Sequence, residues 1–164
     1  MPVRRAVESD IPELLRLMTD LAVFERYDDW FAVTEDVLRE RGFGRPDPEF
    51  VALVAADHPP GSRLDGVLVF YVIPFTLTTR PTLFVKELLV DETARGAGIG
   101  RELMVAASRE AVALGCGLVK WQVAEWNEPG KRFYEGLGAQ PDPTWVDYSL
   151  DERAMAALAR EAAQ

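Results

Sequence analysis

A glycine-rich turn at residues 95–100 (Arg-Gly-Ala-Gly-Ile-Gly) is the feature that most constrains how this chain can fold. It lies between an apolar stretch at 83–90, which predicts a strand, and a segment at 98–114 whose apolar residues recur at helical spacing. Glycine permits a sharp turn and lets a ligand come very close to the main chain. The free N–H groups and the dipole of the helix start favour an anion there, and Arg95 and Arg101 add positive charge.

A pyrophosphate is the anion that this arrangement fits best. A P-loop would require Gly-Lys followed by Ser or Thr at the helix start, but Gly100 is followed by Arg101 and Glu102. A dinucleotide-binding fold would carry its glycines near the first strand, with an acidic residue about 20 positions later. Here the glycines follow the fourth predicted strand. A turn that serves only the fold remains the alternative for this motif taken alone.

The remaining pattern indicates an α/β fold of mixed α+β character, organised as a single domain over residues 1–164. The element order β-α-α-β-β-β-α-β-α-β-α predicts a mixed sheet with helices on both faces, because the β-α-β stretches require crossover connections. Asp10 and Thr34 are candidate N-caps of the first two helices. Strands are predicted at 3–7, 50–56, 66–73, 83–90, 118–124 and 145–150, and helices at 11–22, 34–41, 98–114, 127–138 and from 151 onward.

Composition excludes several classes of protein. The net charge of −9 argues against sequence-independent binding of nucleic acid, because phosphate binding needs a positively charged surface. An acidic surface suits cationic substrates, and it also suits plain solubility. His58 is the only histidine and Cys116 the only cysteine, so neither a zinc cluster nor a Ser-His-Asp triad can be assembled, and we expect no metal. We expect Cys116 to be a small apolar residue rather than a nucleophile.

The sequence also suggests where in the cell the protein is located. The longest apolar run, Val67 to Phe75, is about half of what a bilayer span requires. The N-terminus reaches acidic, amphipathic sequence almost at once, so we expect no signal peptide. A single cysteine forms no intrachain disulfide, and a reducing cytoplasm is the simplest interpretation.

Residues 95–100 resemble the coenzyme A signature of the GNAT acetyltransferases, Q/R-x-x-G-x-G/A, at every fixed position. Residues 123–129 (Val-Ala-Glu-Trp-Asn-Glu-Pro) look like the second half of the diamine (spermidine/spermine) and thialysine acetyltransferases in that family. The resemblance covers most of the chain and is strongest from 83 to 139. It implies a GNAT fold, with splayed fourth and fifth strands, and an acetyl-CoA-dependent N-acetyltransferase. Further matching positions are Leu21-Ala22, Phe24-Glu25, Leu38, Gly42-Phe43-Gly44, Phe133-Tyr134 and Gly138-Ala139.

The resemblance also implies where acetyl-CoA binds. The backbone of 88–90 would bind the pantetheine amides, as an exposed strand edge can. The amides of 96–101 would hold the pyrophosphate. Asn127 would contact the cofactor arm near Gly130, or it would serve only as a helix cap. The implied cofactor-binding residues are Leu88, Leu89, Val90, Arg95, Gly96, Ala97, Gly98, Ile99, Gly100, Arg101, Asn127 and Gly130.

Two residues are candidates for proton transfer. Tyr134 falls where the family carries its general acid, which protonates the departing thiolate. The alternative is that Tyr134 is a core aromatic beside Phe133. Diamine acetyltransferases place two adjacent acids on the fourth strand, and here Lys86 precedes Glu87, so Glu87 is the candidate base. An adjacent ammonium is expected to lower the pKa of Glu87 and make it a poorer base.

Position 86 also bears on the substrate. Strand parity places the Lys86 and Glu87 side chains on opposite faces unless a β-bulge intervenes. Another acid of the diamine enzymes is replaced by Pro143-Thr144, which puts polyamine specificity in doubt. We expect amino-acid-like amines to be better substrates than long polyamines. The candidate substrate-binding residues are Phe24, Glu25, Lys86 and Gln122.

The sequence therefore predicts transfer of an acetyl group to a small primary amine by direct attack in a ternary complex, without an acyl-enzyme. Two alternatives stay open. One is an acetyltransferase acting on protein lysines or N-termini, and the other is a non-catalytic acyl-CoA-binding regulator. Relatives are often homodimers, and we expect the same here. We expect neither nucleic acid nor membrane as a partner.

Overall fold

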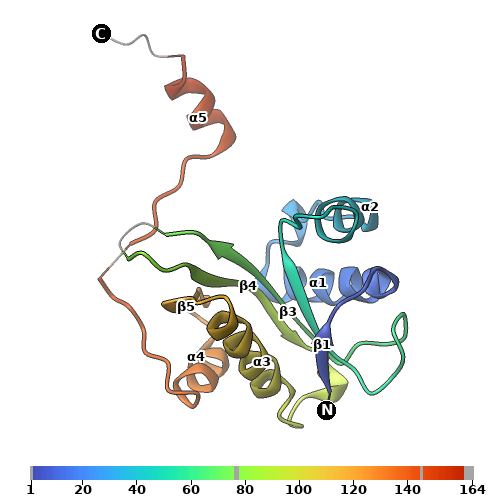
Figure 1. The fold of residues 1–164 in the computed structure, drawn as a ribbon. Coiled ribbons are helices and arrows are strands. Elements are labelled where there is room, and N and C mark those ends of the chain that lie inside the picture. Colours follow the sequence, from blue (N-terminus) through green and yellow to red (C-terminus); the bar gives the residue numbers. More distant parts are fainter. Residues whose placement is uncertain (1, 76–77, 145, 161–164) are drawn as a thin grey trace. The chain divides into compact units, whose positions relative to one another are not determined.

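The computed structural model describes residues 2–75, 78–144 and 146–160. The chain forms two compact units, Met1–Asn127 and Glu128–Gln164. The first contains the sheet with helices α1, α2 and α3, and the second contains α4 and α5 (Figure 1).

The sheet of the first unit has five strands in the order β1-β2-β3-β4-β5. Neighbouring strands run antiparallel except β4 and β5, which are parallel and joined by α3 (Ile99–Ala113). This mixed sheet with a crossover helix confirms the predicted fold class. The strands are β1 (Val3–Arg5), β2 (Val51–Ala55), β3 (Gly66–Ile73), β4 (Thr82–Val90) and β5 (Leu118–Trp121).

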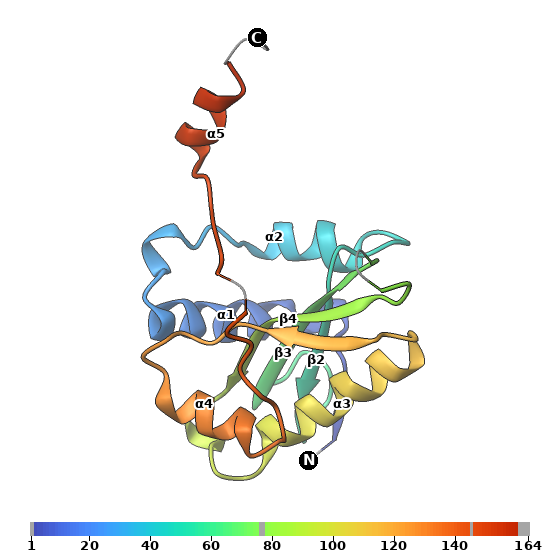
Figure 2. The same cartoon turned by 90° about the vertical axis from the view of Figure 1, so that its left-hand side faces the viewer.

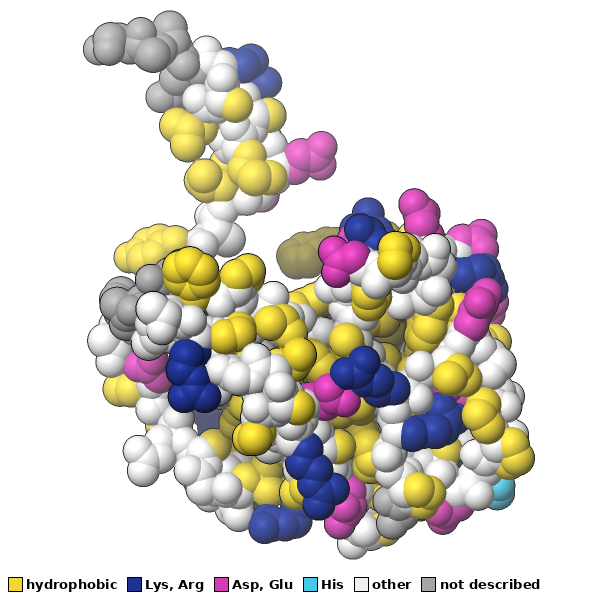
Figure 3. All heavy atoms as spheres, viewed as in Figure 1, with side chains coloured by type: hydrophobic (Ala, Val, Ile, Leu, Met, Phe, Trp, Pro, Cys, Tyr) yellow, Lys and Arg dark blue, Asp and Glu magenta, His cyan; other side chains and the backbone are white. Residues whose placement is uncertain are grey.

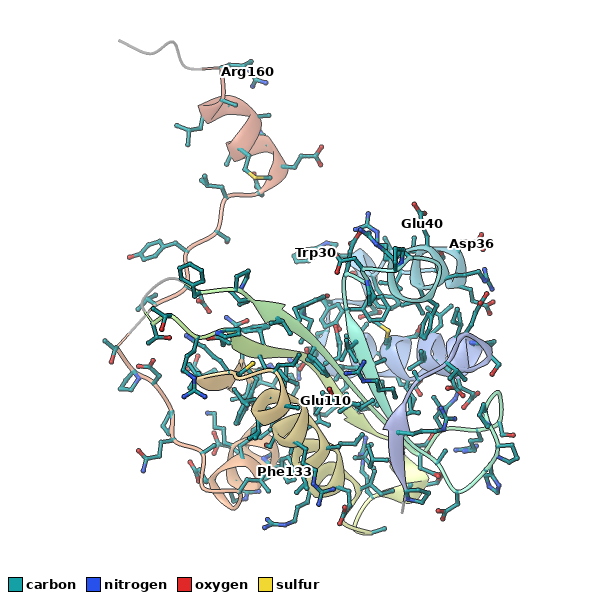
Figure 4. The ribbon with its side chains drawn as sticks, in the orientation of Figure 1. Trp30, Asp36, Glu40, Glu110, Phe133 and Arg160 are labelled. Carbon is teal, nitrogen blue, oxygen red and sulfur yellow. The ribbon has the colours of Figure 1, made fainter. Side chains whose placement is uncertain are left out.

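Helices cover both faces of this sheet, as predicted (Figure 2). On one face lie α1 (Ile11–Glu25) and α2 (Glu35–Leu38), which continues as a π-helical turn at Arg39–Phe43. On the other lies α3, where Glu110 accepts a hydrogen bond from Arg5 Nε of β1 at 3.0 Å (Figure 4). The core under α1 is apolar and comprises Ile11, Leu14, Leu17, Met18, Leu38, Ala52, Val54, Ala56, Leu64, Val67 and Val69.

The prediction that Asp10 caps α1 is wrong. A 3₁₀ turn at Glu8–Asp10 runs directly into α1, so Asp10 is already helical and makes no side-chain cap bond to that helix. Its buried carboxylate instead accepts hydrogen bonds from the N–H groups of Val7 and Gly61, both at 2.9 Å, and pairs with Arg4. Asp10 therefore joins the helix start to β1 and to a distant loop.

Thr34 caps α2 as predicted, because its hydroxyl accepts a hydrogen bond from the Val37 N–H at 3.3 Å. The helical segment continues through Gly42 and ends before Gly44. Strand β5 is shorter than predicted, since residues 122–124 carry no ladder bonds.

The second unit begins with α4 (Glu128–Glu135), where the predicted helix extended to 138. A turn at 136–138 ends it, and Gly138 has a φ of 89°, which favours glycine. Helix α5 (Glu152–Leu158) is capped by Asp151, which accepts from the Ala154 N–H at 2.7 Å. The predicted strand 145–150 is wrong over 146–150, which is irregular, because alternation alone makes no strand without a paired neighbour; position 145 lies outside the described residues.

Candidate functional site

A β-bulge at Lys86 shapes the centre of the candidate site. Val69 of β3 is paired with Glu87 of β4, and Phe70 is paired with Val85, so Lys86 is the extra residue. Directly paired residues share a face, and Val69 belongs to the core under α1. The bulge therefore turns Glu87 toward α1 and brings Lys86 Nζ within 3.6 Å of Glu87 Oε1. This is the exception that the parity argument allowed.

The same region of β4 has an open edge. Pairing with β5 covers only Thr82–Val85 of β4, while pairing with β3 continues to Val90. Residues 88–90 thus have a strand neighbour on one side, within the part of the chain that the structure describes. The unpaired edge offers N–H and C=O groups to an extended ligand. The two strands separate here, as the resemblance implied.

The glycine turn follows this open edge. After β4 a 3₁₀ turn (Glu92–Ala94) leads to Gly96, with a φ of 83°, and Gly98, with a φ of 81°. Gly98 is the N-cap of α3, whose first intrahelical bond runs from the Glu102 N–H to the Gly98 carbonyl at 3.1 Å. The N–H groups of residues 99–101 lie before that bond and form the positive end of the helix dipole.

This turn has room for a bulky anion. A Cβ added at Gly96 or Gly98 would meet nothing within 4 Å, so internal packing does not explain these glycines. Their positive φ favours glycine, and the space beside them is open. Arg95 and Arg101 are exposed beside the turn, and Arg95 Nε donates to the Val90 carbonyl at 3.4 Å. The residues present therefore fit a pyrophosphate.

Glu87 is a buried acid, with 7% of its surface exposed. Burial raises the pKa of its carboxyl, and the nearby Lys86 ammonium only partly opposes this rise. The prediction that the Lys86 ammonium lowers the pKa of Glu87 is confirmed in its direction, but the rise caused by burial is larger. The ammonium acts in the expected direction, but it is half exposed and solvent-screened, whereas removal of water from Glu87 is nearly complete.

Two further groups from the end of α1 surround Glu87. The Tyr27 hydroxyl donates to Glu87 Oε2 at 3.3 Å. Burial raises the pKa of Glu25, opposed by the charge of Lys86. Glu25 was predicted from the sequence, but Tyr27 was not, because no local pattern connects it to a residue 60 positions away.

Aromatic side chains also gather at the end of α1. Phe24 packs against Trp126 with ring centroids 5.4 Å apart, and the Arg26 guanidinium lies 5.1 Å from the Trp126 ring centroid. Both rings are partly exposed. Phe24, predicted to contact substrate, thus belongs to a half-exposed aromatic group beside Glu25.

The other predicted residues lie farther along the chain. Exposed Gln122 and half-buried Asn127 flank the segment after β5, and the Asn127 N–H donates to the Ala124 carbonyl at 2.9 Å. Gly130 and Tyr134 lie on α4 in the second unit. Tyr134 is half buried, and its ring centroid is 5.0 Å from that of Phe133, which Figure 4 labels on α4.

Several other side chains fall outside this chemistry. Cys116 is buried, as expected for a small apolar residue, and His58 is exposed on its loop. Among the described residues, no group of three His, Cys, Asp or Glu side chains is placed to hold a metal ion. No helix in the described ranges is long and apolar enough to cross a membrane. Basic and acidic side chains are interspersed over α2 (Figure 3).

An open β4–β5 pair followed by a glycine turn at the start of α3 is what the resemblance to the N-acetyltransferase class implied. The family model for the acetyltransferase (GNAT) family matches residues 13–139. The chain belongs to the GNAT acetyltransferase family and is an N-acetyltransferase.

Individual relatives agree with this assignment. The chain is 32% identical to a thialysine N-epsilon-acetyltransferase of Mus musculus over 96% of both sequences. It is 27% identical to an L-ornithine N5-acetyltransferase of Arabidopsis thaliana, over 95% of this chain and 86% of that one. Among solved structures, an integron cassette protein from the mobile metagenome of V. cholerae has the same fold, with a TM-score of 0.79 at 20% identity over 98% of both chains.

Proposed function

We propose that this protein transfers an acetyl group from acetyl-CoA to the primary amine of a small, amino-acid-like molecule by direct attack in a ternary complex. The observation that carries the proposal is the buried Glu87 carboxylate, held at a bulge where β4 leaves β5 and its edge becomes open. From this position Glu87 would meet both an amine and an acyl carrier extended along the open edge.

The first unit contains groups that suit coenzyme A. The open edge at 88–90 would bind the pantetheine amides, and the amides of 96–101 would hold the pyrophosphate with help from Arg95 and Arg101. Asn127, the last residue of this unit, is proposed to contact the cofactor arm, and the resemblance adds Gly130 of the second unit. Acetyl-CoA supplies a reactive thioester carbonyl and a thiolate leaving group.

Glu87 is proposed to accept the proton that the substrate ammonium must lose before its nitrogen can attack. A general base works best when its pKa lies near the working pH. Burial moves the pKa of Glu87 upward from its ordinary range, toward that condition. An exposed glutamate would be a weaker acceptor.

Tyr134 is proposed to donate a proton to the departing sulfur. A phenol has the required proton at neutral pH, and Tyr134 lies on α4 at the position where the family resemblance places the acid. A backbone N–H on the open edge of β4 would stabilise the negative charge that develops on the carbonyl oxygen. With Cys116 buried, no acyl-enzyme is proposed.

The charge pattern around Glu87 favours a substrate with both an amine and a carboxylate. Lys86 is half exposed beside Glu87, so it can pair with a carboxylate and would repel a long polycation. The relatives named for thialysine and ornithine act on amines of this kind. Glu25, Phe24 and Gln122 are proposed to complete the substrate site.

A turnover panel that measures free CoA tests the proposal. Thialysine, lysine and ornithine should be acetylated faster, in kcat/KM, than spermine or a lysine-containing peptide. Faster turnover of the peptide would favour the protein-acetylating alternative, and cofactor binding without turnover of any amine would favour a regulator. Glu87→Gln should lower kcat/KM about 10²–10⁴-fold if Glu87 is the base.

Assembly and location stay predictions. We propose a single functional domain that forms a homodimer in the cytoplasm, with neither nucleic acid nor membrane as a partner. Light scattering of the purified chain measures its mass in solution, and a mass of one chain would contradict the dimer.

A further inference from the structure

The two oxygens of the Glu87 carboxylate have different neighbours. Oε2 accepts a hydrogen bond from the Tyr27 hydroxyl at 3.3 Å, and Oε1 lies 3.6 Å from Lys86 Nζ. Tyr27 comes from the segment after α1, while Lys86 belongs to the bulge in β4 itself. The carboxylate is therefore held from one side by a neutral donor and approached from the other by a half-exposed cation.

The backbone at the end of α1 directs Tyr27 to this position. Arg26, the C-cap of α1, has a φ of 63° and a ψ of 38°, which is left-handed and uncommon for a residue with a side chain. The Tyr27 N–H donates back to the Ala22 carbonyl at 3.0 Å, which closes the last turn of α1. A left-handed residue is a common end for a helix, and here it sets the direction in which Tyr27 leaves α1.

Tyr27 is suited to be a permanent donor. Burial, together with the negative charges of Glu87 and Glu25, raises the pKa of its hydroxyl above the ordinary value for tyrosine. The hydroxyl therefore keeps its proton over the pH range in which the acids ionise. A donor that never ionises can orient the carboxylate without competing for the substrate's proton.

We propose that Tyr27 is a positioning residue for Glu87: it holds Oε2 so that Oε1 is presented to the amine and accepts its proton. This inference rests on the proposed role of Glu87 as the base. The proton moves from the substrate nitrogen to Oε1, and the freed nitrogen lone pair becomes the nucleophile. Lys86, half exposed, yields its place at Oε1 when the substrate amine arrives.

The charges that face Glu87 fix the sign of the expected effect. Glu25 comes from α1, Tyr27 from the segment after it and Lys86 from β4, while the paired β3 residue, Val69, is apolar. Glu25 raises the pKa of Glu87, whereas Lys86 and the Tyr27 hydrogen bond lower it. Tyr27→Phe keeps the ring and deletes the hydrogen bond, so the pKa of Glu87 should rise further.

The first experiment compares pH profiles of kcat/KM, whose acid limb reports the base of the free enzyme. In Tyr27→Phe the acid limb should move up by about one pH unit, as expected when a hydrogen bond to a charged group is lost. Tyr71→Phe, which removes a hydroxyl from β3, is the matched control and should leave the limb in place. An unmoved limb in Tyr27→Phe overturns the inference.

The second experiment separates this inference from the proposed function. Carbon-13 NMR of the side-chain carboxyls follows the titration of Glu87 in the free protein, with its signal identified by its loss in Glu87→Gln. Tyr27→Phe should raise that titration point even if another group proves to be the base, and an unchanged point overturns the inference. If Glu87→Gln keeps a wild-type acid limb, the role of Glu87 as base fails, and the positioning role fails with it. In the Glu87→Gln background, adding Tyr27→Phe should change the pH profile no further.

Discussion

The Asp91 carboxylate accepts a hydrogen bond from Arg16 Nη1 at 2.9 Å, which ties the end of β4 to α1. Asp91 is buried, and it also accepts from Arg63 and from the Thr93 hydroxyl and N–H. Thr93 lies in the 3₁₀ turn that leads to the glycine turn. This network therefore anchors the proposed pyrophosphate site to the core.

Asp91→Asn should lower the free energy of unfolding by about 1–3 kcal/mol at neutral pH, because charged hydrogen bonds are lost while both arginines keep access to water. Chemical denaturation measures the loss. Asp20→Asn is the matched control, since exposed Asp20 also pairs with Arg16, and it should change stability by less than about 0.5 kcal/mol. Equal losses in the two variants would contradict the anchoring role.

The stability difference between wild type and Asp91→Asn should depend on pH. Hydrogen bonds from Thr93, and then from Arg63 and Arg16, hold the pKa of Asp91 well below its usual value of 3.8. A depressed pKa contributes stability that is present above the unfolded-state pKa and is lost as pH falls through the folded-state value. The gap between wild type and Asp91→Asn should thus be constant from neutral pH down to about 4 and shrink below it. A gap that widens in acid would refute the assignment.

Gly98→Ala should weaken acetyl-CoA binding about tenfold or more, because the new methyl group enters the space proposed for the pyrophosphate and the residue disfavours a φ of 81°. Calorimetry measures the affinity. Gly115→Ala is the matched control, since Gly115 has a φ of 71° and equally open surroundings at the other end of α3. Both should cost about 1 kcal/mol of stability. Only Gly98→Ala should weaken acetyl-CoA binding. Equal acetyl-CoA affinities in Gly98→Ala and Gly115→Ala would mean that Gly98 does not lie in the cofactor site.

Gly98→Val and Gly100→Val extend this test. Gly98→Val should weaken binding more than Gly98→Ala, because valine is bulkier and stiffer. Gly100 lies within the first turn of α3 and is not among the glycines with positive φ. Gly100→Val should therefore lower affinity by obstruction alone. Wild-type calorimetric affinity in folded Gly100→Val would exclude this residue from the cofactor site.

Tyr134→Phe should lower turnover by about 10²–10⁴-fold while leaving acetyl-CoA affinity nearly unchanged, since only the proton donor is deleted. Single-turnover kinetics separates the chemical step from product release. Tyr148→Phe, at an exposed position in the same unit, is the control and should retain wild-type rates. If Tyr134→Phe also retains them, Tyr134 serves packing beside Phe133.

Lys86→Glu should shift kcat/KM from amino-acid-like amines toward diamines by about 1–2 kcal/mol, because a carboxylate then replaces the cation beside Glu87. Steady-state kinetics on lysine and cadaverine measures the ratio. Lys120→Glu on β5 changes net charge equally at another exposed site and controls for long-range effects. Identical substrate profiles in wild type and Lys86→Glu would show that the charge of Lys86 does not determine substrate preference.

Glu87→Gln should stabilise the fold at pH 7–8 while it lowers activity. Because the pKa of Glu87 is raised in the folded state, its ionisation opposes folding as pH rises past the unfolded-state value of 4.5. A neutral amide of the same shape removes that cost, and each kcal/mol gained raises Tm by about 2–4 °C. Scanning calorimetry should show the gain at pH 7–8 and its disappearance near pH 4. A loss of Tm at pH 7–8 would mean that the ionised carboxylate stabilises the fold.

Local sequence alone determined much of this protein. Thr34 bonds the N–H three residues later, and Gly98 takes the left-handed conformation that ends a turn and starts α3, so both features could be predicted from neighbouring residues. Apolar spacing likewise predicted α1 and β3, because each element buries one regularly repeating face. The order of these elements around the glycine turn was enough to indicate the fold.

Only the tertiary structure decided the chemistry around Glu87. The bulge depends on the register between β3 and β4, and the Tyr27 hydrogen bond joins residues 60 positions apart. The net shift in the pKa of Glu87 depends on how completely the fold buries its carboxyl. The failed strand at 146–150 and the misassigned Asp10 have the same origin. A strand needs a partner, and a buried carboxylate binds whichever donors the fold brings to it, so neither outcome is contained in the nearby sequence.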